Sequence, residues 1–246
     1  MSRKDKIRLD LLLVEKDLAE SREKAKALIM AGVVEVNDVM IDKPGRLVSS
    51  SSVISLKKPS PPYVSRGGLK LEAALDHFPV NVKGLTLLDA GASTGGFTDC
   101  LLQRGAEKVI AVDVGYGQLH WKIRQDPRVT VLEKTNIRYL TPDDLQEPIN
   151  GAVIDVSFIS LRIVVPPVSE LLRKESFIIA LIKPQFEVER HQVGKGGVVR
   201  DQSLHEEVIK KLSTFFEDLD WTVMGHIPSP LLGPKGNREF LIYLKR

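Results

Sequence analysis

The 246-residue sequence contains one cysteine, Cys100, so no disulfide can form within the chain and metal sites built on cysteine pairs are excluded. Its five histidines show no spacing typical of metal ligands: His77, His120, His191, His205 and His226. We therefore expect no metal site. Cys100 itself is expected to be a small core residue rather than a nucleophile.

Long apolar segments are also missing. A helix that spans a bilayer needs about 20 consecutive apolar residues, and no stretch of this sequence approaches that length. The N-terminal sequence Met-Ser-Arg-Lys-Asp-Lys is not followed by an apolar segment of the signal-peptide type. From these absences we expect no membrane partner and a cytoplasmic location.

The net charge is small, +3, but it is unevenly distributed. Residues 1–66 hold 13 Lys and Arg against 9 Asp and Glu, whereas the remainder holds 22 against 23. An excess of Lys and Arg in the N-terminal part of the chain is typical of a surface that binds nucleic acid. A solvated helix face would have the same composition, so charge alone leaves both interpretations open.

Residues 1–58 have the pattern of a small α+β module. The expected elements are helices over 7–18 and 21–30, strands over 33–36 and 53–56, and a turn at 37–38. Ser21 is a good N-cap for the second helix, and Gly32 ends it. Arg22 and Lys26 share one face because they are four residues apart. Prolines then mark a linker over residues 59–66.

The domain over residues 67–246 begins with a helix and continues from residue 84 as alternating strands and helices. Strands are expected at 85–90, 108–113, 129–133, 151–156, 176–182, 220–226 and 238–244, and helices at 67–78, 96–104, 117–124, 160–173 and 202–218. Such alternation predicts a parallel α/β sheet covered by helices, with an antiparallel hairpin where the last two strands follow each other directly.

The glycine-rich turn after the first of these strands is the centre of the domain. It carries six candidate cofactor-binding residues: Asp89, Gly91, Ser93, Gly95, Gly96 and Phe97. A dinucleotide site would need G-x-G-x-x-G, and a carboxylate at Asp89 would repel a pyrophosphate. The same carboxylate suits the cationic S-adenosylmethionine. Asp113 ends the next strand, where such folds bind a ribose, and Asn136 is a candidate for the adenine edge.

Four further polar residues are expected at the same edge of the sheet: Lys70, Asp155, Lys183 and Glu239. Beside a methyl donor they suggest methylation of a ribose 2′-hydroxyl. That hydroxyl is a poor nucleophile with a pKa of roughly 12 to 13, so a lysine that accepts or steers its proton is useful. For Lys183 and Asp155 alone, a simple salt bridge remains the other interpretation.

Two stretches of the chain resemble known families. Arg8-Leu9-Asp10, Ser21-Arg22, Ala25, Leu28-Ile29, Gly32 and Val36-Asn37 look like the alpha-L RNA-binding motif of ribosomal proteins, pseudouridine synthases and tyrosyl-tRNA synthetases. This resemblance implies that the Arg22 helix and its basic neighbours lie on structured RNA. The candidate RNA-binding residues are Arg3, Lys4, Arg8, Arg22, Lys26, Arg66, Arg190 and Lys195, of which the last two lie on a glycine-rich loop over residues 187–200.

Residues 64–246 resemble the FtsJ-type ribose methyltransferases, whose Lys-Asp-Lys-Glu tetrad matches Lys70, Asp155, Lys183 and Glu239. Joined to the RNA-binding front end, the stretches 64–71, 89–98, 155–161, 183–187 and 236–241 resemble the TlyA family.

The TlyA resemblance implies a Rossmann-like, S-adenosylmethionine-dependent methyltransferase sheet that 2′-O-methylates cytidines of ribosomal RNA. Members of the family are often labelled haemolysins. A membrane-active protein and a non-catalytic RNA-binding assembly factor therefore remain alternatives.

Overall fold

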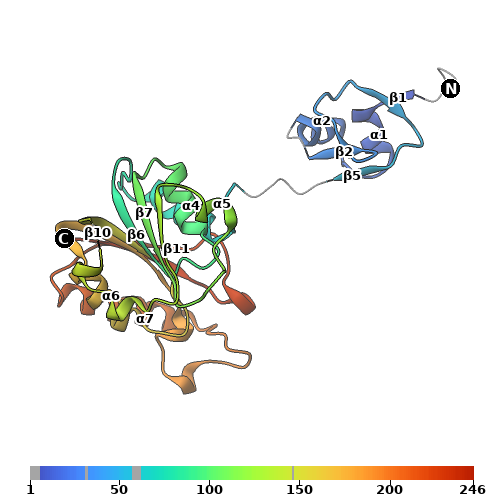
Figure 1. Cartoon of the computed structure of the whole chain (residues 1–246). Coiled ribbons are helices and arrows are strands. Elements are labelled where there is room, and N and C mark those ends of the chain that lie inside the picture. The colour runs from blue at the N-terminus through green and yellow to red at the C-terminus, as the bar shows by residue number, and fades with distance from the viewer. Residues whose placement is uncertain (1–5, 31–32, 57–61, 146) are drawn as a thin grey trace. The chain divides into compact units, whose positions relative to one another are not determined.

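The computed structural model describes residues 6–30, 33–56, 62–145 and 147–246, which form two compact units, Met1–Pro61 and Pro62–Arg246 (Figure 1). Two of the candidate RNA-binding residues, Arg3 and Lys4, lie outside the described residues. Residues 62–66 belong to the second unit, where the Tyr63 side chain is buried and the Val64 amide donates to Asp99 Oδ2 at 2.8 Å.

The first unit is a small α+β fold. Its elements are β1 (Lys6–Arg8), α1 (Leu9–Glu15), α2 (Arg22–Met30), β2 (Val34–Val36), β3 (Val39–Met40), β4 (Leu47–Ser49) and β5 (Ile54–Leu56). β1 pairs antiparallel with β4, and β3, β2 and β5 form a three-stranded antiparallel sheet. Apolar side chains of α1, α2 and β2 close a core of their own around Leu9, Leu13 and Ile29.

The prediction of one helix over residues 7–18 is wrong at its start and its end. Residues 6–8 are extended because they pair with β4, and the Leu9 and Asp10 amides then donate to carbonyls of residues 46 and 44. The helix ends at Glu15, and Asp17 adopts φ +56°, which breaks the helical path. Pairing with a strand about 40 residues away leaves no mark in local periodicity.

The second unit contains a seven-stranded sheet and five α-helices among its described residues. The strands are β6 (Thr86–Ala90), β7 (Lys108–Val112), β8 (Val129–Leu132), β9 (Ile149–Ile154), β10 (Leu172–Ile182), β11 (Thr222–Pro228) and β12 (Phe240–Lys245), and the helices are α3 (Gly67–His77), α4 (Gly96–Gln103), α5 (Trp121–Arg124), α6 (Leu161–Glu170) and α7 (Gln202–Glu217). The strand order is β11-β12-β10-β9-β6-β7-β8.

The predicted parallel α/β sheet with an antiparallel end is confirmed. β6 to β10 pair in parallel, whereas β12 runs antiparallel to both β10 and β11. Side chains of α3, α4 and α5 form a core with one face of the sheet, and those of α6 and α7 form a core with the other (Figure 1). Cys100 is fully buried in the first of these cores, as expected for a packing residue.

The helix predicted over 117–124 is shorter in the structure, which has α5 only from Trp121 to Arg124. Gly117 adopts φ +71°, and the His120 amide donates to the Thr94 carbonyl, so the preceding residues form a loop against the glycine turn. The imidazole of His120 accepts the Lys122 amide and starts the helix there.

The strand order places the ligand site. The chain moves from β6 outward to β7 and β8, and then returns to the other side of β6 with β9, so the order reverses between β6 and β9. In open α/β sheets, ligands bind at the carboxyl ends of the strands beside such a reversal. No helix in the described part of the chain combines the length and apolar character needed to cross a membrane.

Candidate cofactor-binding and catalytic site

In the turn from β6 into α4, the backbone of Gly91 packs directly against the backbone of Asp155, at the point where the strand order reverses. Gly91 has φ +89°, and a Cβ atom on it would lie 2.6 Å from the Asp155 carbonyl oxygen, so no side chain fits there. Ser93 and Gly95 also have positive φ, +48° and +94°, which lets the chain turn into α4. A Cβ on Gly96 would overlap with Ser65 Oγ. Glycine at 91 and 96 is therefore a packing requirement.

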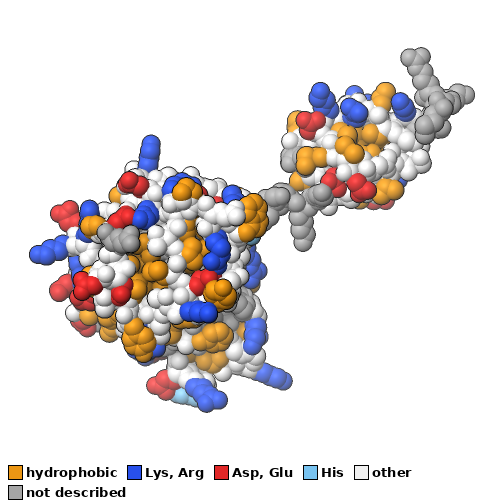
Figure 2. Space-filling model, viewed as in Figure 1, with side chains coloured by type: hydrophobic (Ala, Val, Ile, Leu, Met, Phe, Trp, Pro, Cys, Tyr) orange, Lys and Arg blue, Asp and Glu red, His pale blue; other side chains and the backbone are white. Residues whose placement is uncertain are grey.

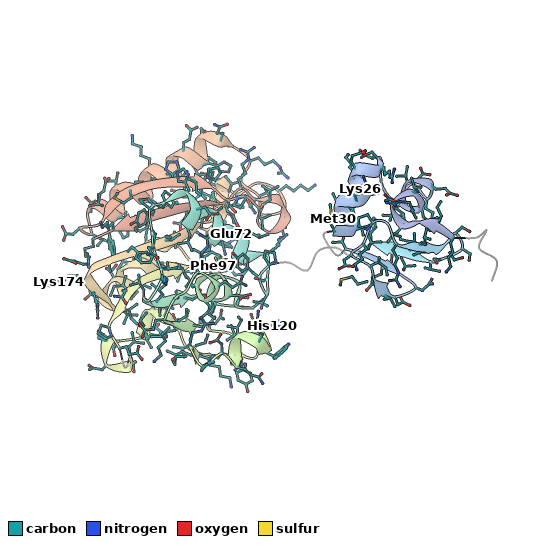
Figure 3. All side chains as sticks on the ribbon, turned by 90° about the horizontal axis from the view of Figure 1, so that it is seen from above. Lys26, Met30, Glu72, Phe97, His120 and Lys174 are labelled. Carbon is teal, nitrogen blue, oxygen red and sulfur yellow. The ribbon has the colours of Figure 1, made fainter. Side chains whose placement is uncertain are left out.

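Two adjoining cavities open at this edge of the sheet and share Gly91, Ser93, Asp155 and Ser157 in their walls. The adenosine-side cavity, as we name the one of about 480 Å³, is lined by residues 112–114, 135–138 and 155–159 together with Gln118 and Val164. The reaction-side cavity, of about 310 Å³, is lined by residues 65–67, 91–94, 96 and 97 together with Lys70, Lys183 and Glu239. Phe97, labelled in Figure 3, belongs to the second set.

The polar groups of the adenosine-side cavity are fixed by backbone contacts. Asp113 accepts the amide of Ser93 at 2.8 Å and that of Gly115 at 2.7 Å, so its carboxylate links the glycine turn after β6 to the loop after β7. Asn136 Oδ1 accepts the Arg138 amide at 3.2 Å, which leaves the amide nitrogen as the donor free to meet a ligand. A carboxylate acceptor and an amide donor in one cavity are groups that could bind a ribose and an adenine edge.

Asp89 differs from the other carboxylates because it lies behind the glycine turn and lines neither cavity. Its side chain is fully buried, Oδ2 accepts Thr98 Oγ1 at 2.6 Å, and Oδ1 has no hydrogen-bond partner in the structure. Burial is the main cause that raises the pKa of this carboxyl to about 7; the Thr98 hydroxyl lowers the pKa and the nearby Asp155 raises it. The ionised form of Asp89 is therefore favourable only when a positive charge lies near the glycine turn.

The four candidate catalytic residues converge on the reaction-side cavity as two ion pairs. Lys183, directly after β10, places Nζ 2.6 Å from Asp155 Oδ1 and donates to Ser157 Oγ at 2.8 Å. Lys70, in the first turn of α3, donates to Glu239 Oε2 at 2.5 Å. Both lysines are buried, and Glu239 Oε1 has no hydrogen-bond partner among the described residues. Residues 169 positions apart in the chain therefore meet in one wall.

Sequence reasoning missed two residues of this site. Ser157 holds Lys183, and it could have been noticed as a polar residue just beyond a strand end. Phe158 lines the adenosine-side cavity with its side chain 89% exposed, at φ +64°. An exposed phenylalanine in the left-handed region is costly by roughly 1–2 kcal/mol. Nothing in the local sequence signals that conformation.

The candidate RNA-binding residues in the described part of the chain occupy different settings. Arg8 and Arg22 both bind the buried Asp10, at 2.9 and 3.0 Å, and each remains about half exposed. Lys26 follows on the same helix (Figure 3), and Lys and Arg side chains are spread over the visible surface of the first unit (Figure 2). Arg66 is exposed and lines the reaction-side cavity. Arg190 and Lys195 are exposed on the loop after β10.

Comparison with known proteins agrees with this arrangement. Residues 63–246 match the FtsJ-like methyltransferase family, and residues 7–54 match the S4 domain. Over 97% of its length the chain is 52% identical to YqxC of Bacillus subtilis, covering 85% of that protein.

Over the same share of its length it is 45% identical to the Mycobacterium tuberculosis protein named 16S/23S rRNA (cytidine-2′-O)-methyltransferase TlyA, covering 89% of it. A solved structure from Streptococcus thermophilus, which carries a haemolysin name, superposes on 98% of this chain and 89% of its own with a TM-score of 0.75 and 46% identity. The chain therefore belongs to the FtsJ-like methyltransferase family and, with its S4 domain, to the TlyA group of enzymes within that family.

Proposed function

We propose that this methyltransferase transfers a methyl group from S-adenosylmethionine to the ribose 2′-hydroxyl of a cytidine in ribosomal RNA. The observation that carries the proposal is the pairing of Lys183 with Asp155, and of Lys70 with Glu239, in one cavity beside the glycine turn. A non-catalytic assembly factor would have no need to bury two lysines at a strand-end cavity.

The residues at the strand reversal fit the proposed cofactor. Gly91 lets the turn approach the Asp155 backbone closely, and Asp113 and Asn136 present an acceptor and a donor toward the adenosine-side cavity. The Asp89 carboxyl is buried behind the turn, where a bound cation would favour its ionised form. S-adenosylmethionine bound there would supply a methyl group on a positively charged sulfur. The negative charges of Asp89 and Asp155 favour such a cation over a pyrophosphate.

Within the proposed reaction, the residues of the cavity position the nucleophile and take its proton. S-adenosylmethionine bound beside the glycine turn would supply the methyl group, and the ribose 2′-oxygen would bond to that carbon as the bond from the carbon to sulfur breaks. Lys183 Nζ would take the 2′-proton only after passing one of its own protons to Asp155, its partner in the ion pair. Asp155 Oδ1 and Ser157 Oγ hold Nζ in place, so that little motion is needed at the moment of transfer. The Lys70–Glu239 pair forms the opposite part of the wall and orients the ribose.

RNA binding is proposed to divide between the two units. In the first unit, Arg8, Arg22 and Lys26 would supply phosphate contacts. In the second, Arg66 lines the reaction-side cavity, and Arg190 and Lys195 are exposed cations on the loop after β10. We propose an RNA-binding domain over 1–58 and a methyltransferase domain over 67–246 that also takes in residues 62–66, because Tyr63 is buried and Val64 is hydrogen-bonded within the second unit. A substrate of ribosomal RNA or ribosomal subunits implies that the enzyme works in the cytoplasm.

The test is to incubate 16S and 23S ribosomal RNA separately with labelled S-adenosylmethionine. We expect the wild type to incorporate label in nucleotides that resist alkaline hydrolysis, because 2′-O-methylation removes the hydroxyl that attacks the neighbouring phosphate. Lys183→Ala should bring incorporation down by about a hundredfold or more, in the range expected when a proton-transfer group is lost.

Lys174→Ala is the matched control because this lysine lies on β10, the strand that Lys183 follows, but is exposed and distant from the cavity (Figure 3). It should methylate at the wild-type rate. Label in alkali-labile nucleotides would instead indicate base methylation and overturn the proposed reaction.

A further inference from the structure

The Lys183–Asp155 pair joins two loops that leave the sheet from neighbouring strands. Asp155, Ser157 and Phe158 follow β9, and Lys183 precedes a 3₁₀ turn over Pro184–Phe186. Both segments are loops at the carboxyl edge of the sheet, beyond the last paired residues of β9 and β10. Their separation therefore depends on contacts between the loops.

Glu187 makes those contacts with both carboxylate oxygens. Oε1 accepts the Leu161 amide at 2.8 Å, and Oε2 accepts Ser160 Oγ at 2.6 Å. Leu161 is the first residue of α6, whose leading amides have no partner within the helix. Glu187, four residues after Lys183, thus ties the loop after β10 to the start of the helix that follows the Asp155 loop.

The hydrogen bonds of Glu187 also hold in place a segment whose backbone is strained at Phe158. Phe158 sits between the Asp155 loop and Ser160 with φ +64°, a conformation that persists only when its surroundings determine it. The ring of Phe186, next to Glu187, lies 5.0 Å from the ring of Phe158. Two contacts, one polar and one aromatic, therefore hold the 157–161 segment against the 183–187 segment, and Ser157 Oγ reaches Lys183 Nζ between them.

We propose that Glu187 is a positioning residue for methyl transfer: by binding Ser160 and the Leu161 amide, it fixes the loop that presents Asp155 and Ser157 to Lys183. This inference rests on the proposed function, since it assigns Lys183 a part in the reaction. Glu187 contacts neither lysine in the structure and acts through the geometry of the loop. Its burial raises the pKa of its carboxyl, which is consistent with a structural acceptor that is kept from solvent.

The experiment compares Glu187→Ala with Glu187→Gln in the full chain. Alanine removes both hydrogen bonds, and we expect kcat to fall about tenfold or more while KM for RNA and the affinity for S-adenosylmethionine change less than about threefold. Glutamine can still accept the Leu161 amide and donate to Ser160 Oγ, so it should keep most of the wild-type kcat. A residue that acted through its charge would lose activity equally in both variants.

Asp201→Ala is the matched control, because Asp201 caps α7 by accepting the Ser203 amide and hydroxyl but lies outside both cavities. Asp201→Ala should lose about as much stability as Glu187→Ala but keep the wild-type kcat. Hydrogen exchange of the 156–163 segment should accelerate in Glu187→Ala and stay unchanged in Asp201→Ala. Should Glu187→Ala fail to fold, Ser160→Ala removes the shorter of the two contacts and should lower kcat in the same direction.

The inference is overturned if Glu187→Ala exchanges faster over residues 156–163 yet keeps the wild-type kcat, or if glutamine is as inactive as alanine. A wild-type enzyme without methyltransferase activity would instead overturn the proposed function, and hydrogen exchange would still report whether Glu187 holds the loop. The two failures are therefore distinguishable.

Discussion

The acidic residues of the methyltransferase unit show how surroundings decide what one side-chain type does. Asp113 accepts two backbone amides, Asp155 forms an ion pair with a lysine, and Asp89 accepts one threonine hydroxyl within the core. Of these three, only Asp89 combines complete burial with a raised pKa. Its ionised form is unfavourable in the folded protein unless a positive charge lies nearby.

This environment predicts that Asp89→Asn stabilises the second unit at pH 8 in the absence of cofactor. The folded pKa of about 7 lies above the usual 3.8, so the folded state binds the proton more tightly and loses stability as the pH rises from about 4 to 7. At roughly 1.4 kcal/mol per pKa unit, the penalty removed is up to about 4 kcal/mol.

Both tryptophans, Trp121 and Trp221, belong to the second unit, so urea unfolding followed by tryptophan fluorescence reports on it alone. The gain from Asp89→Asn should be large at pH 8 and small at pH 5. A gain that is equal at both values would contradict the raised pKa. We also expect the variant to bind S-adenosylmethionine more weakly, because it lacks the buried charge.

Sequence placed the candidate catalytic residues at one edge of the sheet and offered a Lys183–Asp155 salt bridge as one interpretation, but it gave no partner for Lys70. Asp155 and Lys183 were predictable because polar residues after buried strands meet at one edge of a parallel sheet. That Lys183 binds Asp155 while Lys70 binds Glu239 depends on side-chain paths across the cavity, which no local pattern encodes. Similarly, Arg22 was predictable as a surface cation, but its contact with Asp10 was not.

At the scale of elements, the strands of the sheet were the most predictable part of the chain. β6, β7 and β9 are mostly buried and mostly apolar, so composition and length identify them. The elements that sequence missed are short: β1 depends on β4, about 40 residues away, and β3 has only two residues, paired with β2 across the turn at 37–38. The shortened α5 has the same origin, because the loop before it is fixed by Thr94 in another segment.

The glycine turn gives a prediction at this scale: Gly91→Ala should abolish cofactor binding and destabilise the second unit. Its Cβ would lie 2.6 Å from the Asp155 carbonyl oxygen, so β6 and β9 would have to separate where the cavities meet. Gly84→Ala is the matched control. It has a similar φ of +72°, but a Cβ there meets nothing within 4 Å.

The control should show only the backbone strain of a positive φ, about 1 kcal/mol, with wild-type affinity for S-adenosylmethionine. Calorimetric titration measures the affinity, and urea unfolding measures the stability. If Gly91→Ala behaves like Gly84→Ala in both measurements, close backbone approach at the strand reversal does not matter for cofactor binding.

Across the whole molecule, the two units have separate hydrophobic cores. Leu9, Leu13 and Ile29 belong to the core of the first, and the cores on either face of the large sheet belong to the second. Each unit also has a fully buried carboxylate with a shifted pKa, Asp10 in the first and Asp89 in the second. Since the ionisation of a buried group is linked to the stability of the unit that contains it, the units should respond to pH independently.

Acidification should therefore affect the two units in opposite directions over different ranges. Arg8, which hydrogen-bonds Asp10, and Arg22, which binds it from the other side, hold the pKa of Asp10 well below its usual range. A lowered folded pKa contributes stability that is present above about pH 4 and is lost as the pH falls below it. The raised pKa of Asp89 instead adds stability as the pH falls from about 7 toward 4.

Hydrogen exchange from pH 8 to pH 3, corrected for its intrinsic pH dependence, can follow each unit by its own peptides. We expect the 9–30 segment to keep its protection down to about pH 4 and then lose it, whereas the 86–102 segment should gain protection between pH 8 and 5. Asp10→Asn should remove only the loss of protection of the first unit below about pH 4. Asp89→Asn should remove only the gain of protection of the second unit between pH 8 and 5. A common loss of protection in both segments between pH 8 and 5 would show that the buried carboxylates do not govern the two units separately.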